Sequence, residues 1–175
     1  MAGYGICVCG LNGSGKTTLA GALAKELGFK HMDIEDYYFV PTDIPYSVSR
    51  SREEAEQLLL SDMQENPRFV FSAVDGNMGV KYDLVIYLYA PLDVRMERVK
   101  KRAIDRFGDR ILPGGDMYEQ EQEFFDFVSK RDATSVEEWL QTVSCRVIWL
   151  DGTYDIVDNI GEIMKVINEE KGSLV

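Results

Sequence analysis

Residues 4–18 read YGICVCGLNGSGKTT and carry the strongest structural signal in the chain. The run at 4–9 is apolar on both faces, which is typical of a central parallel strand covered by helices on both sides. Residues 10–17 follow directly and match the pattern G-x-x-x-x-G-K-[ST] without a gap. Residues 15–27 then place apolar side chains at helical spacing, and Gly28 ends this helix. The sequence therefore predicts a strand, a glycine-rich loop and a helix in succession.

The loop at residues 10–17 has the composition of a phosphate-binding nest. Glycines permit backbone conformations that turn successive N–H groups toward an anion, and the N-terminus of the following helix favours negative charge. Lys16 supplies a mobile cation for the β- and γ-phosphates of a nucleoside triphosphate, and the Thr17 hydroxyl is a ligand for Mg²⁺. A plain turn is the alternative, but the strand before and the helix after the loop disfavour it. We expect the nucleotide to contact Gly10, Leu11, Asn12, Gly13, Ser14, Gly15, Lys16, Thr17 and Thr18.

Composition excludes several classes of protein. The chain has 175 residues, enough for one domain with a hydrophobic core, and its formal net charge is −11. This acidic balance opposes nonspecific binding to nucleic acid, whose phosphates require clustered cations. Three cysteines, an odd number, argue against a disulfide framework and favour a reducing compartment. No apolar stretch approaches the roughly 20 residues that a membrane span needs. We expect a cytoplasmic protein that binds neither nucleic acid nor membrane.

Strands and helices alternate along the rest of the chain. Short apolar runs predict strands, and apolar residues at helical spacing predict the helices between them. Strands are expected at 29–34, 68–74, 84–89 and 146–150, and helices at 52–65, 92–106, 117–130, 134–142 and from about 157 onward. This alternation predicts an α/β fold with a helix-covered parallel sheet. Cys7 and Cys9 are expected in its core, and Phe124, Phe125 and Phe127 are interpreted as packing residues.

The segment GLNGSGKTT, together with three later features, resembles the small P-loop kinases, the group that contains adenylate kinase and shikimate kinase. The resemblance covers most of the chain. It implies a three-layer P-loop NTPase fold, with a five-stranded parallel sheet in the order 2-3-1-4-5 and a helical lid insertion. Residues 1–175 then form one domain, in which about 35–66 bind the phosphoryl acceptor and about 103–134 form the lid. The implied cofactors are ATP or ADP and Mg²⁺.

The first of the three features is Asp75-Gly76, directly after the third predicted strand. Adenylate kinases carry a similar Asp-Gly there, and the resemblance implies that Asp75, with Thr17, organises Mg²⁺ and its water shell. A carboxylate at the carboxyl end of a parallel strand lies at the edge where ligands bind. An ordinary Asp-Gly turn is the alternative interpretation.

The second feature is an arginine stripe on one helical face, made of Arg95, Arg98, Arg102 and Arg106. The segment ERVKKR is similar to the adenylate kinase stretch that enters the lid. This similarity implies that Arg98 packs against the adenine and that Arg102 reaches the transferring phosphate. Arginine suits both roles because its planar fork stacks on rings and grips phosphate with two bonds. A solvated basic face is the alternative. The segment RVIWLDGTYD resembles the final strand and loop of these kinases, so Gly152 and Thr153 are candidate adenine contacts.

The third feature is the acidic segment HMDIEDYY at residues 31–38. Shikimate-type kinases place D-x-D here, and uridine-kinase-like enzymes place an Asp followed by aromatic residues. Asp33 begins a D-x-E that departs from the first pattern by one carbon, and Asp36 begins a segment that loosely resembles the second. A carboxylate here orients or deprotonates an attacking hydroxyl, or holds Mg²⁺ through water. Solvated acidic residues at a strand end are the alternative. Arg50 and Arg52, in the acceptor region, are candidates for clamping a phosphate or carboxylate.

Together these features predict a Mg²⁺-dependent enzyme that transfers the γ-phosphate of ATP to a nucleoside monophosphate, a nucleoside or another small metabolite. The predicted catalytic residues are Lys16, Arg102, Asp33 and Asp36. Two departures leave the acceptor open: the Pro-Arg that adenylate kinases carry after Asp-Gly is missing, and so is the triple glycine of shikimate kinase. The alternative function is a nucleotide-binding switch or regulatory ATPase without a phosphoryl acceptor. We expect a monomer or a homodimer.

Overall fold

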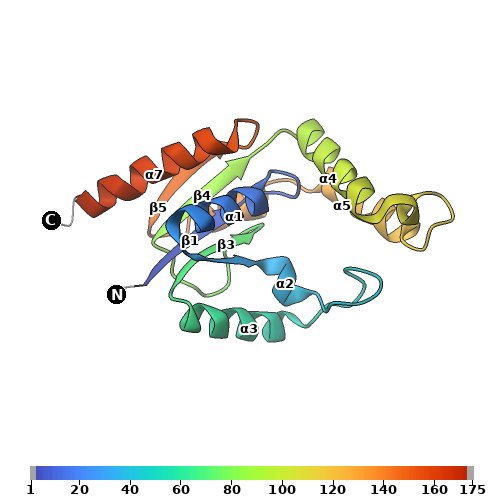
Figure 1. Ribbon diagram of the computed structural model, residues 1–175, viewed down its shortest axis with the longest axis horizontal. Coiled ribbons are helices and arrows are strands. Elements are labelled where there is room, and N and C mark those ends of the chain that lie inside the picture. Colours follow the sequence, from blue (N-terminus) through green and yellow to red (C-terminus); the bar gives the residue numbers. More distant parts are fainter. Residues whose placement is uncertain (1–2, 173–175) are drawn as a thin grey trace.

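Five strands form one parallel sheet in the computed structural model, which describes residues 3–172. The strands are β1 (Tyr4–Cys9), β2 (Lys30–Asp33), β3 (Arg68–Ala73), β4 (Leu84–Tyr89) and β5 (Arg146–Asp151). They lie in the order β2-β3-β1-β4-β5, and each neighbouring pair is parallel. The α/β class and the expected strand order are therefore confirmed. Because β1 is central, the glycine-rich loop leaves from the middle of the sheet's edge (Figure 1).

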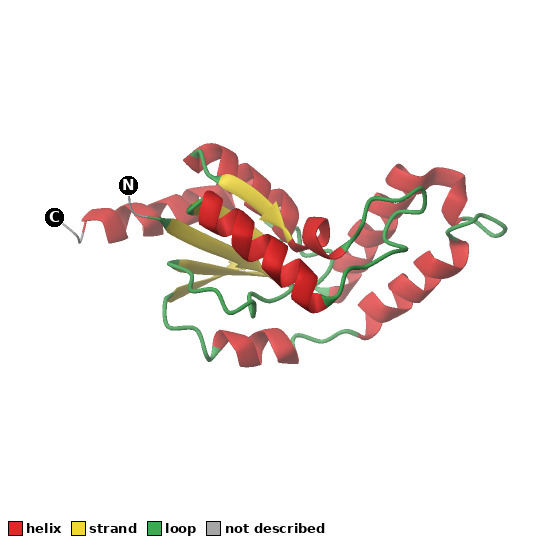
Figure 2. Ribbon diagram, turned by 90° about the horizontal axis from the view of Figure 1, so that it is seen from below, coloured by secondary structure: helices red, strands yellow, loops and turns green. Residues whose placement is uncertain are grey.

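Helices cover both faces of this sheet (Figure 1, Figure 2). α1 (Lys16–Leu27) and α7 (Ile156–Gly172) pack on one face, and α3 (Arg52–Glu65) and α6 (Thr134–Leu140) pack on the other. The three expected layers are thus present. Among the helices of residues 3–172, none has both the length and the apolar character that crossing a bilayer requires.

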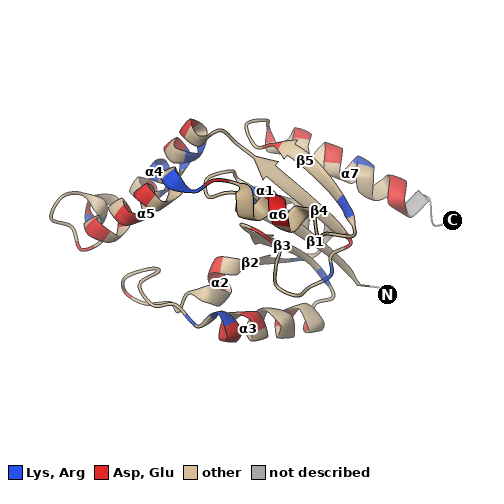
Figure 3. Ribbon diagram, turned by 180° about the vertical axis from the view of Figure 1, so that it is seen from behind, with Lys and Arg blue, Asp and Glu red and all other residues tan. Residues whose placement is uncertain are grey.

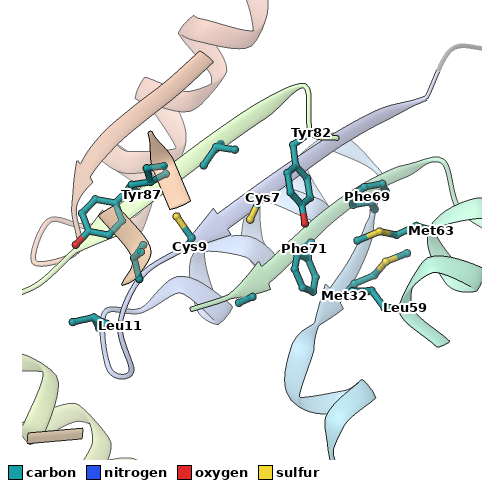
Figure 4. Packing of buried hydrophobic residues seen from close by; sticks show 14 residues of the cluster. Cys7, Cys9, Leu11, Met32, Leu59, Met63, Phe69, Phe71, Tyr82 and Tyr87 are labelled. Atoms are coloured by element: carbon teal, nitrogen blue, oxygen red, sulfur yellow. The ribbon is translucent and has the colours of Figure 1, made fainter. Parts of the chain in front are cut away.

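The strands alternate their side chains between the two helical layers, which explains why β1 is apolar on both faces. Ile6 and Val8 pack with α1 and α7, whereas Cys7 and Cys9 face the layer of α3 and α6. All four side chains are fully buried. Figure 4 shows both cysteines on the same side of the sheet as the ring of Tyr82. The expectation that Cys7 and Cys9 belong to the core is confirmed.

An arm of helices extends beyond the sheet (Figure 1). It consists of α4 (Leu92–Phe107), the 3-10 helix η1 (Gly108–Ile111) and α5 (Tyr118–Lys130). The arm has a small core of its own, in which Ala103, Ile111 and Met117 are buried. Arg110 and Asp116 form a salt bridge of 2.8 Å in the connection between its helices. Figure 3 shows that Lys and Arg gather on α4 while Asp and Glu predominate on α5. The region expected to form the lid falls on this arm.

α2 (Ile34–Tyr38) is a short helix that the apolar pattern does not predict. The sequence assigns residues 29–34 to a strand and leaves 37–50 irregular. In the structure β2 ends at Asp33, whose carboxylate caps α2 by accepting a hydrogen bond of 3.0 Å from the Glu35 amide. Five residues are too few to produce a periodic apolar signal, so the helix is visible only in the structure.

Candidate functional site

The glycine-rich loop joins the carboxyl end of β1 to the first turn of α1. Gly15 is the N-cap residue and Lys16 is the first helical residue, so the loop amides and the helix N-terminus converge at this point. Gly13 has a φ of 83°, and a β-carbon on it would lie under 3.0 Å from three backbone atoms of Arg95. The sequence therefore needs glycine here, because the loop runs directly against the first turn of α4.

The back of the loop is tied to the rest of the protein. Leu11 packs in the core of the sheet, and the backbone carbonyl of Asn12 accepts a hydrogen bond of 3.4 Å from Arg95. The side-chain oxygen of Asn12 accepts another, of 3.5 Å, from Arg131. Gly10, Leu11 and Asn12 do not line the cavity over the loop, so their contact with a nucleotide stays a prediction.

A cavity of about 390 Å³ opens over the loop. The loop and the first turn of α1 form one side of it, and α4 and the segment after β5 form the others. The predicted residues that meet there are Gly13, Ser14, Gly15, Lys16, Thr17, Thr18, Arg98, Arg102 and Gly152. Residues from three distant parts of the sequence thus converge on one space.

Lys16 lies in a dense cluster of charges. Burial lowers the pKa of Lys16, the carboxylates of Glu35 and Asp33 oppose this shift, and the guanidinium groups of Arg102 and Arg131 add to it. All four groups are therefore close enough to act on the ammonium charge. Three cations face two carboxylates here, which leaves positive potential for a polyphosphate.

Arg98 bridges two sides of the cavity. Its guanidinium donates to the carbonyl of Ser14 at 3.2 Å and to the carbonyl of Gly152 at 2.9 Å. It therefore links the phosphate loop to the segment after β5. Thr153 is exposed and does not line the cavity, because its amide and hydroxyl both donate to the Asp151 carboxylate, at 2.7 and 2.6 Å.

A second cavity, of about 190 Å³, lies next to the first. Val99 and Arg102 line both cavities, so the two spaces share one wall on α4. The other walls come from α2, the loop after it and α5. The remaining lining residues are Glu35, Phe39, Tyr46, Ala103, Arg106, Phe107, Gln120, Glu121 and Phe124.

Of the three carboxylates in the acidic segment, only Glu35 lines the second cavity. Both oxygens of Asp33 are engaged, one with the Glu35 amide and the other with the Ser72 hydroxyl, each at 3.0 Å. Asp33 lies near Lys16 but lines neither cavity. Asp36 is exposed and also lines neither, because one residue along a helix turns the side chain by about 100°. The structure thus brings Glu35, rather than Asp36, to the cavity.

The two arginines expected to clamp the acceptor lie elsewhere. Arg50 donates to the carbonyls of Tyr37 and Phe39, at 2.9 and 3.0 Å, and so holds the end of α2. Arg52 forms a salt bridge of 2.6 Å with Glu56 on the surface of α3. Neither arginine lines either cavity, because both guanidinium groups are engaged in local structure.

The predicted magnesium ligands are Thr17 and Asp75, and the Asp33 carboxylate, which acts on the charge of Lys16, is a third oxygen donor in this region. Thr17 lines the first cavity, and Asp75 follows β3, where its carboxylate accepts a hydrogen bond of 3.1 Å from the Asn77 amide. The part of the chain from 3 to 172 contains no cluster of three or more His, Cys, Asp or Glu that would enclose a metal. Mg²⁺ keeps several waters and binds through one or two carboxylates and the substrate phosphates. The donor set therefore fits magnesium bound together with a nucleotide.

Sequence reasoning missed the part of the second cavity that α5 supplies. Phe124, interpreted as a packing residue, lines the cavity, whereas Phe125 packs in the core of the arm and Phe127 is exposed. Glu121 lies three residues before Phe124 and therefore on the same helix face. The pairing of acidic Glu121 with Phe124 on one helix face was the signal in the sequence that could have indicated a cavity wall here.

The strand order, together with a glycine-rich phosphate loop after the central strand, defines a P-loop protein with the fold of the small kinases. Residues 6–111 match the family described as AAA domain. The match covers more than half of the chain, and the chain belongs to this family.

Similar proteins include both uncharacterized and characterized ones. The chain is 29% identical to YqaC, an uncharacterized protein of Bacillus subtilis (strain 168), over 93% of this chain and 97% of that protein. It is 34% identical to a cytidylate kinase of Pyrococcus abyssi over 55% of this chain and 60% of the kinase. It is 30% identical to a shikimate kinase of Psychrobacter cryohalolentis over 55% of this chain and 59% of the kinase. The chain thus spans about three fifths of the length of these two kinases.

Solved structures share the fold at low sequence identity. A deoxyadenosine kinase from M. mycoides with bound dATP superposes with a TM-score of 0.59 at 19% identity, covering 94% of this chain and 100% of that one. A sugar kinase from Janibacter sp. HTCC2649 superposes with a TM-score of 0.55 at 18% identity, covering 95% of each chain. The expected P-loop kinase fold is confirmed.

Proposed function

We propose that the protein is a Mg²⁺-dependent phosphotransferase that moves the γ-phosphate of ATP to a small molecule. The observation that carries this proposal is the pair of cavities that share a wall at Val99 and Arg102. The first cavity contains the phosphate loop, and the second contains Glu35, whose carboxylate acts on the charge of Lys16. A donor in one cavity and an acceptor in the other meet beside Lys16 and Arg102. The cytidylate, shikimate and deoxyadenosine kinases among the similar proteins support this class of reaction.

The donor nucleotide binds in the first cavity, with its phosphates on the loop amides and the N-terminus of α1. Lys16 contacts the β- and γ-phosphates, and Arg98 packs against the base beside Gly152. The Thr17 hydroxyl and the carboxylate of Asp33 or Asp75 would hold Mg²⁺. When bound, the metal neutralises charge on the phosphates.

The acceptor hydroxyl lies beside Glu35 at the shared wall. Its oxygen attacks the γ-phosphorus, the bond to the β–γ bridging oxygen breaks, and ADP leaves with that electron pair. Glu35 takes the proton of the hydroxyl. Lys16 and Arg102 stabilise the charge on the transferring group. Asp33 positions Glu35, because it binds the Glu35 amide and caps the helix that carries it.

A regulatory ATPase without an acceptor is the alternative function. Such a protein has no use for a separate cavity that places a carboxylate next to the reacting phosphate. The second cavity therefore favours the kinase.

The test is a screen of nucleosides, nucleoside monophosphates, sugars and sugar acids with ATP and Mg²⁺. ADP release is followed, and the product is identified by mass spectrometry. At least one acceptor class should increase ADP release. With a hydroxyl acceptor, Glu35→Gln should lower kcat by about 100- to 10,000-fold, the range of a general base. Asp36→Asn, the exposed neighbour, should stay within about twofold of the parent, because surface substitutions change little. ADP release that no acceptor increases would contradict the proposal and favour the regulatory ATPase.

A further inference from the structure

The second cavity contains a buried acidic group that phosphoryl transfer does not use. Glu121 lines the cavity from α5, and the residue is only 5% exposed. Within residues 3–172 its carboxyl group takes part in no hydrogen bond or salt bridge. Its carboxyl oxygens are not among the fully buried atoms that lack a partner, so they are accessible in the cavity, where a ligand can donate a hydrogen bond to them.

The neighbouring cations do not satisfy Glu121. Arg102 and Arg106 act on its charge from α4, yet burial outweighs them and raises the pKa of Glu121. Arg106 is engaged elsewhere, since it donates to the Tyr46 hydroxyl and lies over the Tyr46 ring, 5.2 Å from its centroid. The carboxyl oxygens of Glu121 are therefore available to a hydrogen-bond donor inside the cavity.

Aromatic side chains form much of the remaining wall. Phe39 and Tyr46 meet edge to face with ring centroids 5.0 Å apart, and Phe107 and Phe124 line the cavity from the arm. Its volume of about 190 Å³ compares with about 150 Å³ for an engineered cavity that binds benzene. The space thus suits one substituted ring, and aromatic walls favour a flat one.

The loop after α2 is fastened to the arm beside this cavity. Gln120 donates to the carbonyl of Pro45 at 3.0 Å, and Arg110 donates to the carbonyl of Asp43 at 3.2 Å. These bonds place Tyr46, which directly follows the anchored Pro45, against the cavity. Hydrogen bonds from the arm therefore hold the Tyr46 side of the aromatic wall in position.

We propose that the second cavity binds the acceptor through a single heteroaromatic ring that carries an amino group, and that Glu121 selects this ring. The ring packs between the aromatic walls and its amino group donates to the carboxyl oxygens of Glu121. The reactive group of the acceptor then lies at Glu35 and Arg102. When an oxo group replaces the amino group, the oxo oxygen faces a carboxylate oxygen of Glu121, and neither atom can donate a hydrogen bond to the other. A ring of this kind is therefore rejected. This proposal rests on the proposed function, because the ring belongs to the phosphoryl acceptor.

The test compares three nucleosides that share a sugar and a pyrimidine ring. Cytidine carries an amino group, uridine carries an oxo group, and the pyrimidin-2-one ribonucleoside carries neither at that position. Binding is measured by calorimetry, and kcat/KM is measured with ATP and Mg²⁺; the monophosphates are assayed in parallel. We expect cytidine, or its monophosphate, to exceed both others by about 10- to 100-fold in affinity and in kcat/KM, as for one well-formed base contact.

Variants assign this preference to the carboxyl group. Glu121→Gln should lower the advantage of cytidine over uridine at least about tenfold, because a carboxamide also donates to an oxo group. Glu123→Gln is the matched control on the exposed side of α5 and should keep the preference of the parent. Phe124→Leu should weaken binding of all three nucleosides by about two- to tenfold, because it removes an aromatic wall. Thermal melting checks that each variant is folded.

Each outcome separates the two proposals. Equal affinity for cytidine and the pyrimidin-2-one nucleoside, no binding of either, or an unchanged preference in Glu121→Gln overturns the ring site. If Glu121→Gln does not fold, the Phe124→Leu result and the ligand series in the parent protein decide. Selective binding of cytidine without any phosphorylated product overturns the proposed function but leaves the ring site. Phosphorylation of an acceptor without any preference among the three rings overturns the ring site but leaves the proposed function.

Discussion

Replacing Gly13 by alanine tests whether the phosphate loop depends on its contact with α4. Two costs follow from the geometry. Alanine in the left-handed region costs roughly 1–2 kcal/mol, and the φ of Gly13 is 83°. The new methyl would also lie under 3.0 Å from three backbone atoms of Arg95, and overpacking of this kind costs about 1–3 kcal/mol. The free energy of unfolding should fall by about 2–5 kcal/mol, the sum of the two costs.

Gly28 supplies the matched control. It is also left-handed, with a φ of 66°, but a β-carbon there would meet nothing within 4 Å. Gly28→Ala should therefore cost only the conformational part, about 1–2 kcal/mol, or about 2–8 °C in Tm for a chain of this size. The extra cost in Gly13→Ala should appear both in Tm and in nucleotide affinity, because the loop must move off α4.

Thermal melting and calorimetric titration with ATP, at fixed Mg²⁺ concentration, measure both effects. Gly13→Ala should melt below Gly28→Ala and lose ATP affinity, while Gly28→Ala should bind ATP like the parent. Equal melting temperatures and equal ATP affinities for the two variants would refute the reasoning, since the contact with Arg95 would then constrain nothing.

Two further predictions concern charged groups of the cavities. Arg102→Ala should lower kcat by about 100- to 1,000-fold, as for loss of one group that stabilises developing charge, with a much smaller change in the Kd for ATP. Lys101→Ala, its exposed neighbour, is the control, and an unchanged kcat in Arg102→Ala would remove this arginine from the transfer step. Glu121→Gln should stabilise the protein at pH 8 by about 0.5–2 kcal/mol, a typical gain where a functional group is held at a cost. The sign follows because burial raises the folded-state pKa of Glu121: the carboxyl destabilises the fold increasingly as pH rises from its unfolded to its folded pKa, and has no such effect below the unfolded pKa. Urea unfolding at pH 4 and pH 8 measures this, and a Glu121→Gln variant less stable than the parent at pH 8 would contradict it.

The central strands β3, β1 and β4 were predictable because burial on both faces leaves a continuous apolar run. β1, with Ile6 and Val8 on one side and Cys7 and Cys9 on the other, is the clearest case. The phosphate loop was predictable because its backbone geometry restricts residue type, as at Gly13. Both signals are local, and each needs only one segment of sequence.

The second cavity was not predictable in the same way because no single segment forms it. Glu35 and Tyr46 come from α2 and the loop after it, whereas Phe124 comes from α5, far along the sequence, and none of them is unusual in its own segment. Choosing between Glu35 and Asp36 requires the orientation of α2, which is set by the Asp33 cap rather than by a periodic pattern. The sequence predicted Asp33 and Asp36, and not Glu35, as the catalytic carboxylates. Substituting each of the three residues in turn compares that prediction with the role proposed for Glu35.

The common wall on α4 has a thermodynamic consequence. Val99 and Arg102 touch both compartments, so any displacement of this helix by one ligand reshapes the space for the other. Linkage then requires reciprocity: if nucleotide changes the affinity for the acceptor by some factor, the acceptor changes the affinity for nucleotide by the same factor. Cooperativity between the two substrates would thus originate in one turn of a single helix.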